Sequence, residues 1–320
     1  MDLFALGTPL IDMFAKADDA LLKKIGVTKG ATNYFSAVQL AAMEKKLGRQ
    51  VFYRYAGDNA RNVCEGFAAL GGFCGFAGAV GADKAGAEFS ANLSECGIAD
   101  FLQEKKGSTG KIVALITPDK ERTFCADLGV SSQCNEFDAL AVENSRMLYL
   151  SSITLVVKAP VAKLALKYAD AFKKAGKRIA LSIENPPMVK ENAKFLLSFA
   201  QKYADILFLN ESEADALLGK GAERKLHFLK TKAPIYLKKG KHGSLLFYGG
   251  RMNRIAAMKA KVMDTTGAGD AYAAGALYGI SRGYSVLSSA KLGCYLATKV
   301  VAKFGAGVPL AHTRIRLKHR

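Results

Sequence analysis

The chain has 320 residues, of which 50% are hydrophobic and 23% are charged, and its formal net charge is +18. This composition is typical of a globular protein and excludes an intrinsically disordered chain. No apolar run reaches the roughly 18 residues that span a bilayer, and the first residues lack the basic segment of a secretory signal, so we expect a cytoplasmic protein.

The excess of Lys and Arg over Asp and Glu, 46 against 28, suits nucleic acid, acidic membranes or anionic substrates. The basic residues are spread along the sequence, however, with one dense cluster at Arg314–Arg320 and no basic stripe interleaved with aromatic residues. We therefore expect no specific nucleic-acid partner and no membrane partner. The six cysteines form no CxxC pair and there is no HExxH, so neither a disulfide framework nor a zinc site is expected.

The first part of the chain mixes segments of different kinds. The start is predicted to be a strand, and Ile11–Ala56 contains short alternating segments that do not suit a parallel core. The sequence Gly-Asp-Asn near residue 58 opens a helix that runs to Leu70, and FCGFAGAVG follows as a buried strand. Gly110–Leu128 is typical of a hairpin around Pro118-Asp119-Lys120.

From Met147 onward, strands and helices alternate. MLYLSSITL, RIALSIE and DILFLN are predicted to be buried strands. Helices are predicted from Pro160 to Gly176, from ENPP to Tyr203 and over ESEADALL. IYLKKG and GSLLFYGG are predicted to pair, and RIAAMKAKVMD is predicted to be a strand that leads into TTGAGD. This rhythm predicts a three-layer α/β/α fold with a mainly parallel central sheet.

The two stretches that break the rhythm, at about 11–56 and 108–128, predict a small antiparallel β lid over one edge of the core. A cover of this kind commonly closes over a substrate. We expect a single domain over residues 1–320 with the lid inserted into it. The lid could serve one chain, as a monomer, or form the interface of a homodimer, and the sequence leaves both open.

The stretch VMDTTGAGDAYAAG combines a glycine turn with a carboxylate. Gly267, Ala268 and Gly269 precede a helix of small residues, and Asp270 stands at its head. Free amides at a helix start bind anions, and a carboxylate beside them can accept a hydroxyl proton. The combination suits phosphoryl transfer to an alcohol. The alternative is an N-cap aspartate without further role. A Rossmann motif does not fit, because Tyr272 stands at its third glycine, and no GxxxxGK[ST] occurs.

Three segments, in order, resemble the ribokinase-like (carbohydrate kinase family B) kinases, and within them the adenosine kinase group. They are the stretch from Tyr55 to Phe89, NESEADALL from Asn210 and DTTGAGDAYAAG from Asp264, and the opening LGTPLIDMF also resembles adenosine kinases. The resemblance implies a ribokinase-like fold and a kinase that uses ATP and Mg²⁺. Its acceptor would be a primary hydroxyl of an adenosine-like nucleoside, with a ribose- or fructose-type sugar as the alternative. A non-catalytic nucleotide-binding member is a further alternative.

The resemblance also implies roles for individual residues. Asp270 matches the catalytic base, with its anion hole at Gly267, Ala268 and Gly269. The residues that match nucleotide contacts are Asn210, Glu213, Lys238, Gly240 and Thr265, and Glu213 would hold Mg²⁺ through water. The residues that match acceptor contacts are Asp12, Gly57, Asp58, Asn62 and the lid residue Arg122. A monovalent cation such as K⁺ would lie near Asp264 and the loop FGAG.

Four positions depart from the family pattern. Asp58 follows Gly57 where the family has a second glycine, and this side chain either contacts the acceptor or narrows the pocket. Lys238 replaces a threonine and could pair with phosphate. Thr8 replaces an asparagine, and Ile153 stands where an aromatic residue stacks on a base in some members. These changes weaken adenosine as the acceptor more than they weaken the kinase chemistry.

Overall fold

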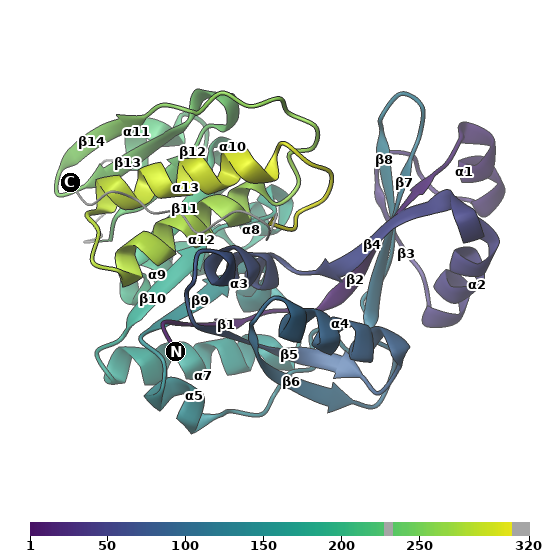
Figure 1. Cartoon of the computed structure of the whole chain (residues 1–320), viewed down its shortest axis with the longest axis horizontal. Coiled ribbons are helices and arrows are strands. Elements are labelled where there is room, and N and C mark those ends of the chain that lie inside the picture. Colours follow the sequence, from purple (N-terminus) through teal and green to yellow (C-terminus); the bar gives the residue numbers. More distant parts are fainter. Residues whose placement is uncertain (227–232, 309–320) are drawn as a thin grey trace.

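A nine-stranded, mostly parallel sheet forms the centre of the larger part of the molecule (Figure 1). Its strands are β1 (Leu3–Leu6), β5 (Cys74–Gly81), β6 (Ala99–Lys105), β9 (Met147–Ser151), β10 (Arg178–Ser182), β11 (Ile206–Asn210), β12 (Ile235–Lys238), β13 (Ser244–Tyr248) and β14 (Arg251–Ile255). Their order is β14-β13-β12-β11-β10-β9-β1-β5-β6. The pairs from β12 to β6 are parallel, and β13 and β14 form an antiparallel edge. The computed structural model describes residues 1–226 and 233–308, so the basic cluster Arg314–Arg320 lies outside the described residues.

Helices cover both faces of this sheet, because alternate strand residues are apolar on each side. In β1, Leu3 and Ala5 belong to one buried cluster, and Phe4 and Leu6 belong to the other. The first cluster includes side chains of α3 (Asn59–Ala69), α4 (Lys84–Glu95), α12 (Ala268–Ser281) and α13 (Val286–Val300). The second includes side chains of α5 (Ala139–Glu143), α6 (Ser152–Val156), α7 (Pro160–Lys174), α8 (Pro186–Glu191), α9 (Ala193–Tyr203), α10 (Glu211–Leu218) and α11 (Ala222–Leu226).

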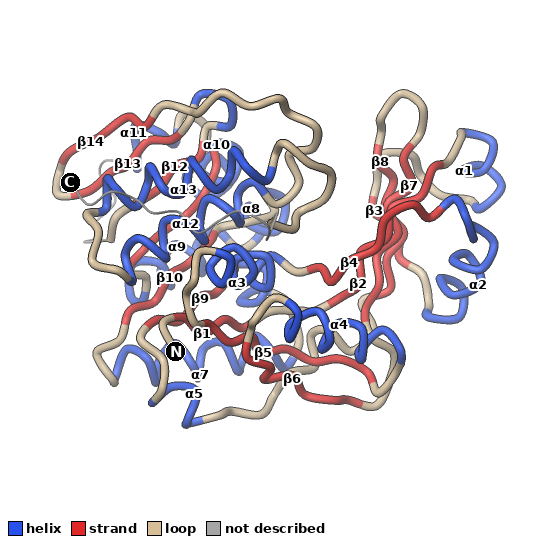
Figure 2. Tube along the Cα trace, in the orientation of Figure 1, coloured by secondary structure: helices blue, strands red, loops and turns tan. Residues whose placement is uncertain are grey.

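The lid is a five-stranded sheet of order β3-β8-β7-β2-β4. Its strands are β2 (Leu10–Lys16), β3 (Thr32–Tyr34), β4 (Val51–Gly57), β7 (Gly110–Ile116) and β8 (Arg122–Asp127). The pairs β2/β4 and β7/β8 are antiparallel, whereas β2/β7 and β3/β8 are parallel. Two helices, α1 (Asp19–Ile25) and α2 (Ala37–Leu47), lie on the side of the lid that faces away from the core (Figure 2).

The predicted fold class is confirmed: a large, mainly parallel sheet between helices, with a smaller sheet beside it. The details differ where polar side chains stop an element. The strand predicted over MLYLSSITL ends at Ser151, whose hydroxyl accepts a hydrogen bond from the Thr154 amide and so caps α6. The strand predicted through Asp264 ends at Ile255. The lid helices α1 and α2 were not predicted, although Ser36 and Gln39 form a capping box.

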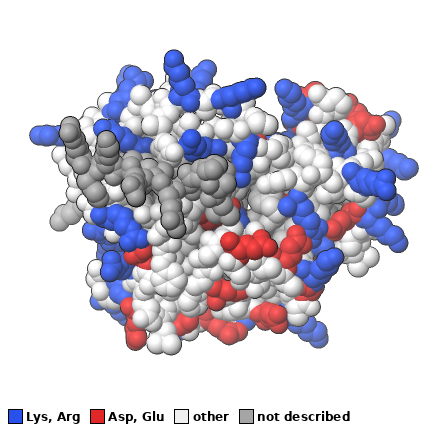
Figure 3. All heavy atoms as spheres, in the orientation of Figure 1, with Lys and Arg blue, Asp and Glu red and all other residues white. Residues whose placement is uncertain are grey.

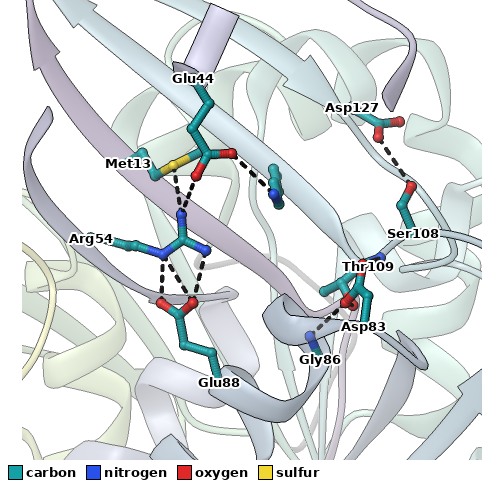
Figure 4. A network of polar contacts seen from close by, with 10 residues as sticks. Met13, Glu44, Arg54, Asp83, Gly86, Glu88, Ser108, Thr109 and Asp127 are labelled. Carbon is teal, nitrogen blue, oxygen red and sulfur yellow. Dashed lines mark hydrogen bonds and ion pairs between the residues drawn. The ribbon is translucent and has the colours of Figure 1, made fainter. Parts of the chain in front are cut away.

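An ion-pair network joins the lid to the core (Figure 4). The Arg54 guanidinium in β4 lies 2.7 Å from a carboxylate oxygen of Glu88 in α4 and 2.7 Å from one of Glu44 in α2. The Lys111 ammonium in β7 lies 3.0 Å from the other carboxylate oxygen of Glu44. Next to it, the Asp83 carboxylate accepts hydrogen bonds from the amide and the hydroxyl of Thr109. These contacts hold the lid against the core where the two meet.

The face seen in Figure 3 shows no concentrated basic stripe among the described residues. Lys and Arg side chains are spread over the face seen in Figure 3, and the acidic side chains lie mostly in its lower middle part. Within residues 1–226 and 233–308, every helix is too short or too polar to cross a bilayer.

Candidate active site

Polar residues end the central parallel strands at one edge of the sheet. Asn210 ends β11 and is in register with Lys238, which ends β12. Glu184 follows the end of β10, and the chain enters the lid just after the end of β1. Ligands of open α/β sheets bind outside the carboxyl ends of the strands. The candidate site therefore lies at this edge, beside the lid.

The start of α12 provides free backbone amides. Gly267 is the N-cap, with φ of 74°, and a Cβ there would come within 2.5 Å of Ala306, so both the turn and the packing require glycine. The Ala268 amide is used within the turn, since it donates to the Thr265 carbonyl at 3.2 Å. In the described part of the chain, the amides of Gly269 and Asp270 have no acceptor. An anion at this helix start would therefore meet these two amides first.

Asp270 lies in the first turn of α12 but does not cap it, because the cap position belongs to Gly267. One oxygen of its carboxylate accepts a hydrogen bond from the Asn62 side-chain amide of α3 at 2.9 Å. Burial and the nearby carboxylate of Glu184 raise the pKa of Asp270 well above its usual value. A carboxylate with a raised pKa is a stronger base for a hydroxyl proton than an exposed aspartate.

Lys238 places a positive charge over the same turn. Its ammonium nitrogen lies 3.1 Å from the position that a Cβ would take on Gly269. Among the described residues it has no hydrogen bond and no ion pair, and it acts on Asp270, Glu184 and Glu213 only through longer-range attraction. A partly buried ammonium without a partner beside free amides suits a negatively charged ligand.

Glu184 was missed by the sequence reasoning. It is 6% exposed, and its carboxylate accepts hydrogen bonds from the Asn59 amide at 2.6 Å and the Tyr149 hydroxyl at 3.3 Å. Burial raises the pKa of Glu184 to about 7, while the hydrogen bond from Asn59 and the charge of Lys238 oppose the rise. The signal in the sequence was a glutamate directly after a buried strand, at the edge where the other polar residues gather.

Asn210 and Glu213 form a capping box at the start of α10. The Asn210 side chain accepts from the Glu213 amide at 2.9 Å, and the Glu213 carboxylate accepts from the Asn210 amide at 2.6 Å. Glu213 is 7% exposed, and burial raises its pKa. Its other carboxylate oxygen has no hydrogen-bond partner among the described residues, so the residue suits a hydrated Mg²⁺. No group of three or more acidic, His or Cys side chains among the described residues forms a complete metal cage.

Asp12, Gly57 and Asp58 lie together where β2 and β4 enter the lid. Asp12 is paired in register with Tyr55 across the two strands. Burial raises the pKa of Asp12 to about 7. A Cβ on Gly57 would lie 2.1 Å from an Asp12 carboxylate oxygen, so a side chain at residue 57 would displace Asp12. Asp58 caps α3, the helix that carries Asn62.

Arg122 reaches from the lid to the loop before α12. Its guanidinium donates to the Asp264 carboxylate at 3.0 Å and to the Thr266 hydroxyl at 2.9 Å. The same carboxylate accepts hydrogen bonds from the Thr266 amide and hydroxyl and from the Gly305 amide. Asp264 thus already has a cation and three further donors, which argues against a K⁺ ion held by this carboxylate.

The structure brings most of the predicted residues to one edge of the sheet and its junction with the lid. Two predicted nucleotide contacts are exposed: Gly240 begins a turn after β12, with φ of 53°, and Thr265 supplies a carbonyl to the α12 turn. Arg122 contacts Asp264, not a predicted acceptor residue. Ile153, in α6, is aliphatic and occupies the position where a stacking aromatic residue is expected.

Sequence comparison finds similar kinases. The family model for pfkB family carbohydrate kinases matches residues 23–314. The chain is 27% identical over 270 residues to the 5-dehydro-2-deoxygluconokinase of Shouchella clausii, covering 79% of this chain and 82% of that protein.

Comparison with solved structures also finds kinases. The structure of an adenosine kinase from Sinorhizobium meliloti aligns with a TM-score of 0.84 and 28% identity, covering 97% of each chain. A probable sugar kinase from Rhizobium etli aligns with a TM-score of 0.85 and 24% identity, covering 96% of this chain and 95% of that chain, which supports the fold alone. With its phosphotransferase relatives and a family match over most of its length, this chain belongs to the pfkB family of carbohydrate kinases.

Proposed function

We propose that this chain transfers the γ-phosphoryl group of ATP to a primary hydroxyl of a sugar, with Asp270 as the general base. The observation that supports this most directly is the first turn of α12. This turn carries the Asp270 carboxylate and the free amides of Gly269 and Asp270, and the Lys238 ammonium reaches it from the end of β12. A base beside a preorganised anion site is what phosphoryl transfer to a hydroxyl requires.

Each residue would do a separate part of the work. Asn62 holds one oxygen of Asp270, so the carboxylate is oriented before the acceptor arrives. The two amides and Lys238 stabilise the charge that develops on the transferred group. Glu213 would hold Mg²⁺ through water, and the ion, when bound, supplies charge neutralisation at the phosphates. The lid would exclude water from the reacting groups.

A sugar is better supported than the nucleoside expected from the opening LGTPLIDMF. The curated relatives that match most of this chain include the 5-dehydro-2-deoxygluconokinase of Shouchella clausii. Ile153 cannot stack on a base as an aromatic side chain would. Adenosine is the second candidate acceptor, because the Sinorhizobium meliloti protein, 28% identical over nearly the whole chain, is an adenosine kinase.

ADP formation with ATP, Mg²⁺ and single acceptors tests the proposal. The panel contains D-ribose, D-fructose, adenosine and 5-dehydro-2-deoxy-D-gluconate, with the Asp270→Ala variant as the control. We expect ADP formation that depends on a sugar and is lost at least ~10²-fold in the variant, the usual contribution of a general base. ADP formation with adenosine alone would favour the second candidate. ATP binding without transfer to any acceptor would favour a non-catalytic protein.

A further inference from the structure

We propose that Asp58, held in place by Thr8, makes the acceptor site selective for uncharged sugars and closes it to sugar acids. The inference rests on the proposed kinase function and narrows its substrate class. It starts from two departures from the family pattern, at residues 8 and 58, which the fold brings into direct contact.

Asp58 has a backbone conformation that suits glycine. Its φ is 153°, in a region of backbone conformation that residues with side chains rarely adopt. The surrounding contacts hold it there: its carboxylate accepts from the Thr8 amide at 2.8 Å, the Thr8 hydroxyl at 3.3 Å and the Arg61 amide at 2.9 Å. Asp58 thus combines a strained backbone with a carboxylate that is held in a fixed position by three hydrogen bonds.

These donors favour the charged form of Asp58. Burial raises its pKa, but the hydrogen bonds from Thr8 and from the first amides of α3 act in the opposite direction. The positive end of the helix dipole at the start of α3 adds to the same effect. None of the direct donors is a cationic group, so no ion pair neutralises the charged form of Asp58.

This charge lies next to the place that the acceptor must occupy. The reacting hydroxyl has to reach Asp270, which is bonded to Asn62. Asn62 lies one turn after Asp58 in the sequence, and its backbone amide donates to the Asp58 carbonyl at 2.9 Å. On the other side, the carboxylate of Asp12 lies against the backbone of Gly57. A sugar with a hydroxyl at Asp270 therefore extends past the carboxylates of Asp58 and Asp12.

The neighbouring basic side chains are directed elsewhere. Arg61 is 2% exposed and pairs with Glu65 at 2.6 Å. Lys238 lies over Gly269, at the phosphate end of the site. Arg122 pairs with Asp264. The carboxylate of a sugar acid would thus meet the carboxylate of Asp58 and the partly charged carboxylate of Asp12. The three cations just named are paired or lie at the phosphate end, whereas sugar hydroxyls could donate to both carboxylates.

The comparison of matched acceptors tests this inference. ADP formation is measured for D-fructose and D-ribose, and for the acids D-gluconate and 5-dehydro-2-deoxy-D-gluconate. We expect kcat/KM for the best uncharged sugar to exceed that for either acid at least ~10-fold, as repulsion between nearby like charges requires. An acid that matches or exceeds the sugars overturns the inference and leaves the kinase proposal standing. No ADP formation with any acceptor overturns both.

Two variants separate the charge of Asp58 from its structural role. Asp58→Asn keeps the size of the side chain, and Asp58→Gly relieves the backbone conformation. Both remove the charge, so we expect the acid-to-sugar ratio of kcat/KM to rise at least ~10-fold in whichever variant folds. Asp138→Asn is the matched control, because Asp138 also caps a helix, α5, away from the site. An unchanged ratio in both Asp58 variants overturns the inference.

Discussion

The side-chain amide of Asn62 donates to the Asp270 carboxylate at 2.9 Å across 208 residues of sequence. The bond favours the charged form of Asp270, so it lowers a pKa that burial and Glu184 raise. It connects α3, the helix that begins at the lid junction, to the base at the start of α12. The acceptor and phosphate ends of the proposed site are thus joined by one hydrogen bond.

Asn62→Ala should therefore move the pH dependence of the reaction. Without the donor, the pKa of Asp270 rises further, and a larger fraction of the base is protonated at a given pH. We expect the acid limb of the kcat profile to shift to higher pH and kcat at neutral pH to fall ~10-fold or more. Asn192→Ala, which removes an amide that donates to the Met188 carbonyl in α8, is the control. A profile that keeps its acid limb would contradict this role for Asn62.

Lys238 and Lys239 are adjacent in sequence but differ in their contacts, which makes them a matched pair. The Lys239 ammonium forms ion pairs with Glu211 at 3.1 Å and Glu223 at 2.6 Å, whereas Lys238 has no partner among the described residues. We expect Lys238→Met to lower kcat ~10²-fold, since it removes a charge aimed at the transferred group. Lys239→Met should leave kcat within about twofold, because exposed ion pairs contribute little. Equal effects of the two changes would argue against a catalytic Lys238.

The sequence predicted the core of this structure better than its lid. Buried strands and helix starts are local signals, so β5, α3, α7 and α10 lie close to their predicted positions. The lid helices were missed because α1 and α2 interrupt strands that pair with distant segments. The strand predicted to continue to Asp264 ends at Ile255.

The candidate site likewise contains residues that a local motif predicted and residues that only tertiary contacts reveal. Asp270 and the glycine turn were recognised from a contiguous motif. Glu184 was missed, since its importance comes from Asn59 and Tyr149, which approach it from other elements. The contact between Thr8 and Asp58 was equally inaccessible, because two separate departures from a pattern do not reveal that they touch. Tertiary contacts of this kind require the folded chain.

Arg122 fastens the lid to the loop that precedes the anion site. The Arg122 side chain is 35% exposed, whereas the side chain of Asp264, with which it pairs, is 2% exposed. Arg122→Gln should loosen this contact, so we expect a higher KM for the acceptor and a severalfold increase in ATP hydrolysis without acceptor, because water then reaches the phosphates more easily. Lys29→Gln is the control, since its ion pairs with Asp19 and Asp119 lie within the lid and its hairpin. If both variants behave alike, the lid contact of Arg122 has no special role.

Glu184 should make the stability of the protein fall as the pH rises. Burial raises its pKa to about 7, above the usual value of 4.5, so the folded state binds a proton more tightly than the unfolded chain. The free energy of unfolding then decreases between about pH 4.5 and pH 7. Above that range the contribution of this group to stability no longer changes with pH. In Glu184→Gln the side chain cannot ionise, so this part of the pH dependence disappears.

Thermal unfolding at several pH values measures the effect. We expect the Tm of Glu184→Gln, relative to that of the unchanged protein, to rise between pH 5 and pH 8, because only the unchanged protein has to bury a charge at the higher pH. Glu191→Gln, a change in an exposed glutamate of α8, should give a constant difference. A constant difference for Glu184→Gln as well would mean that Asn59, Tyr149 and Lys238 compensate fully for the buried charge.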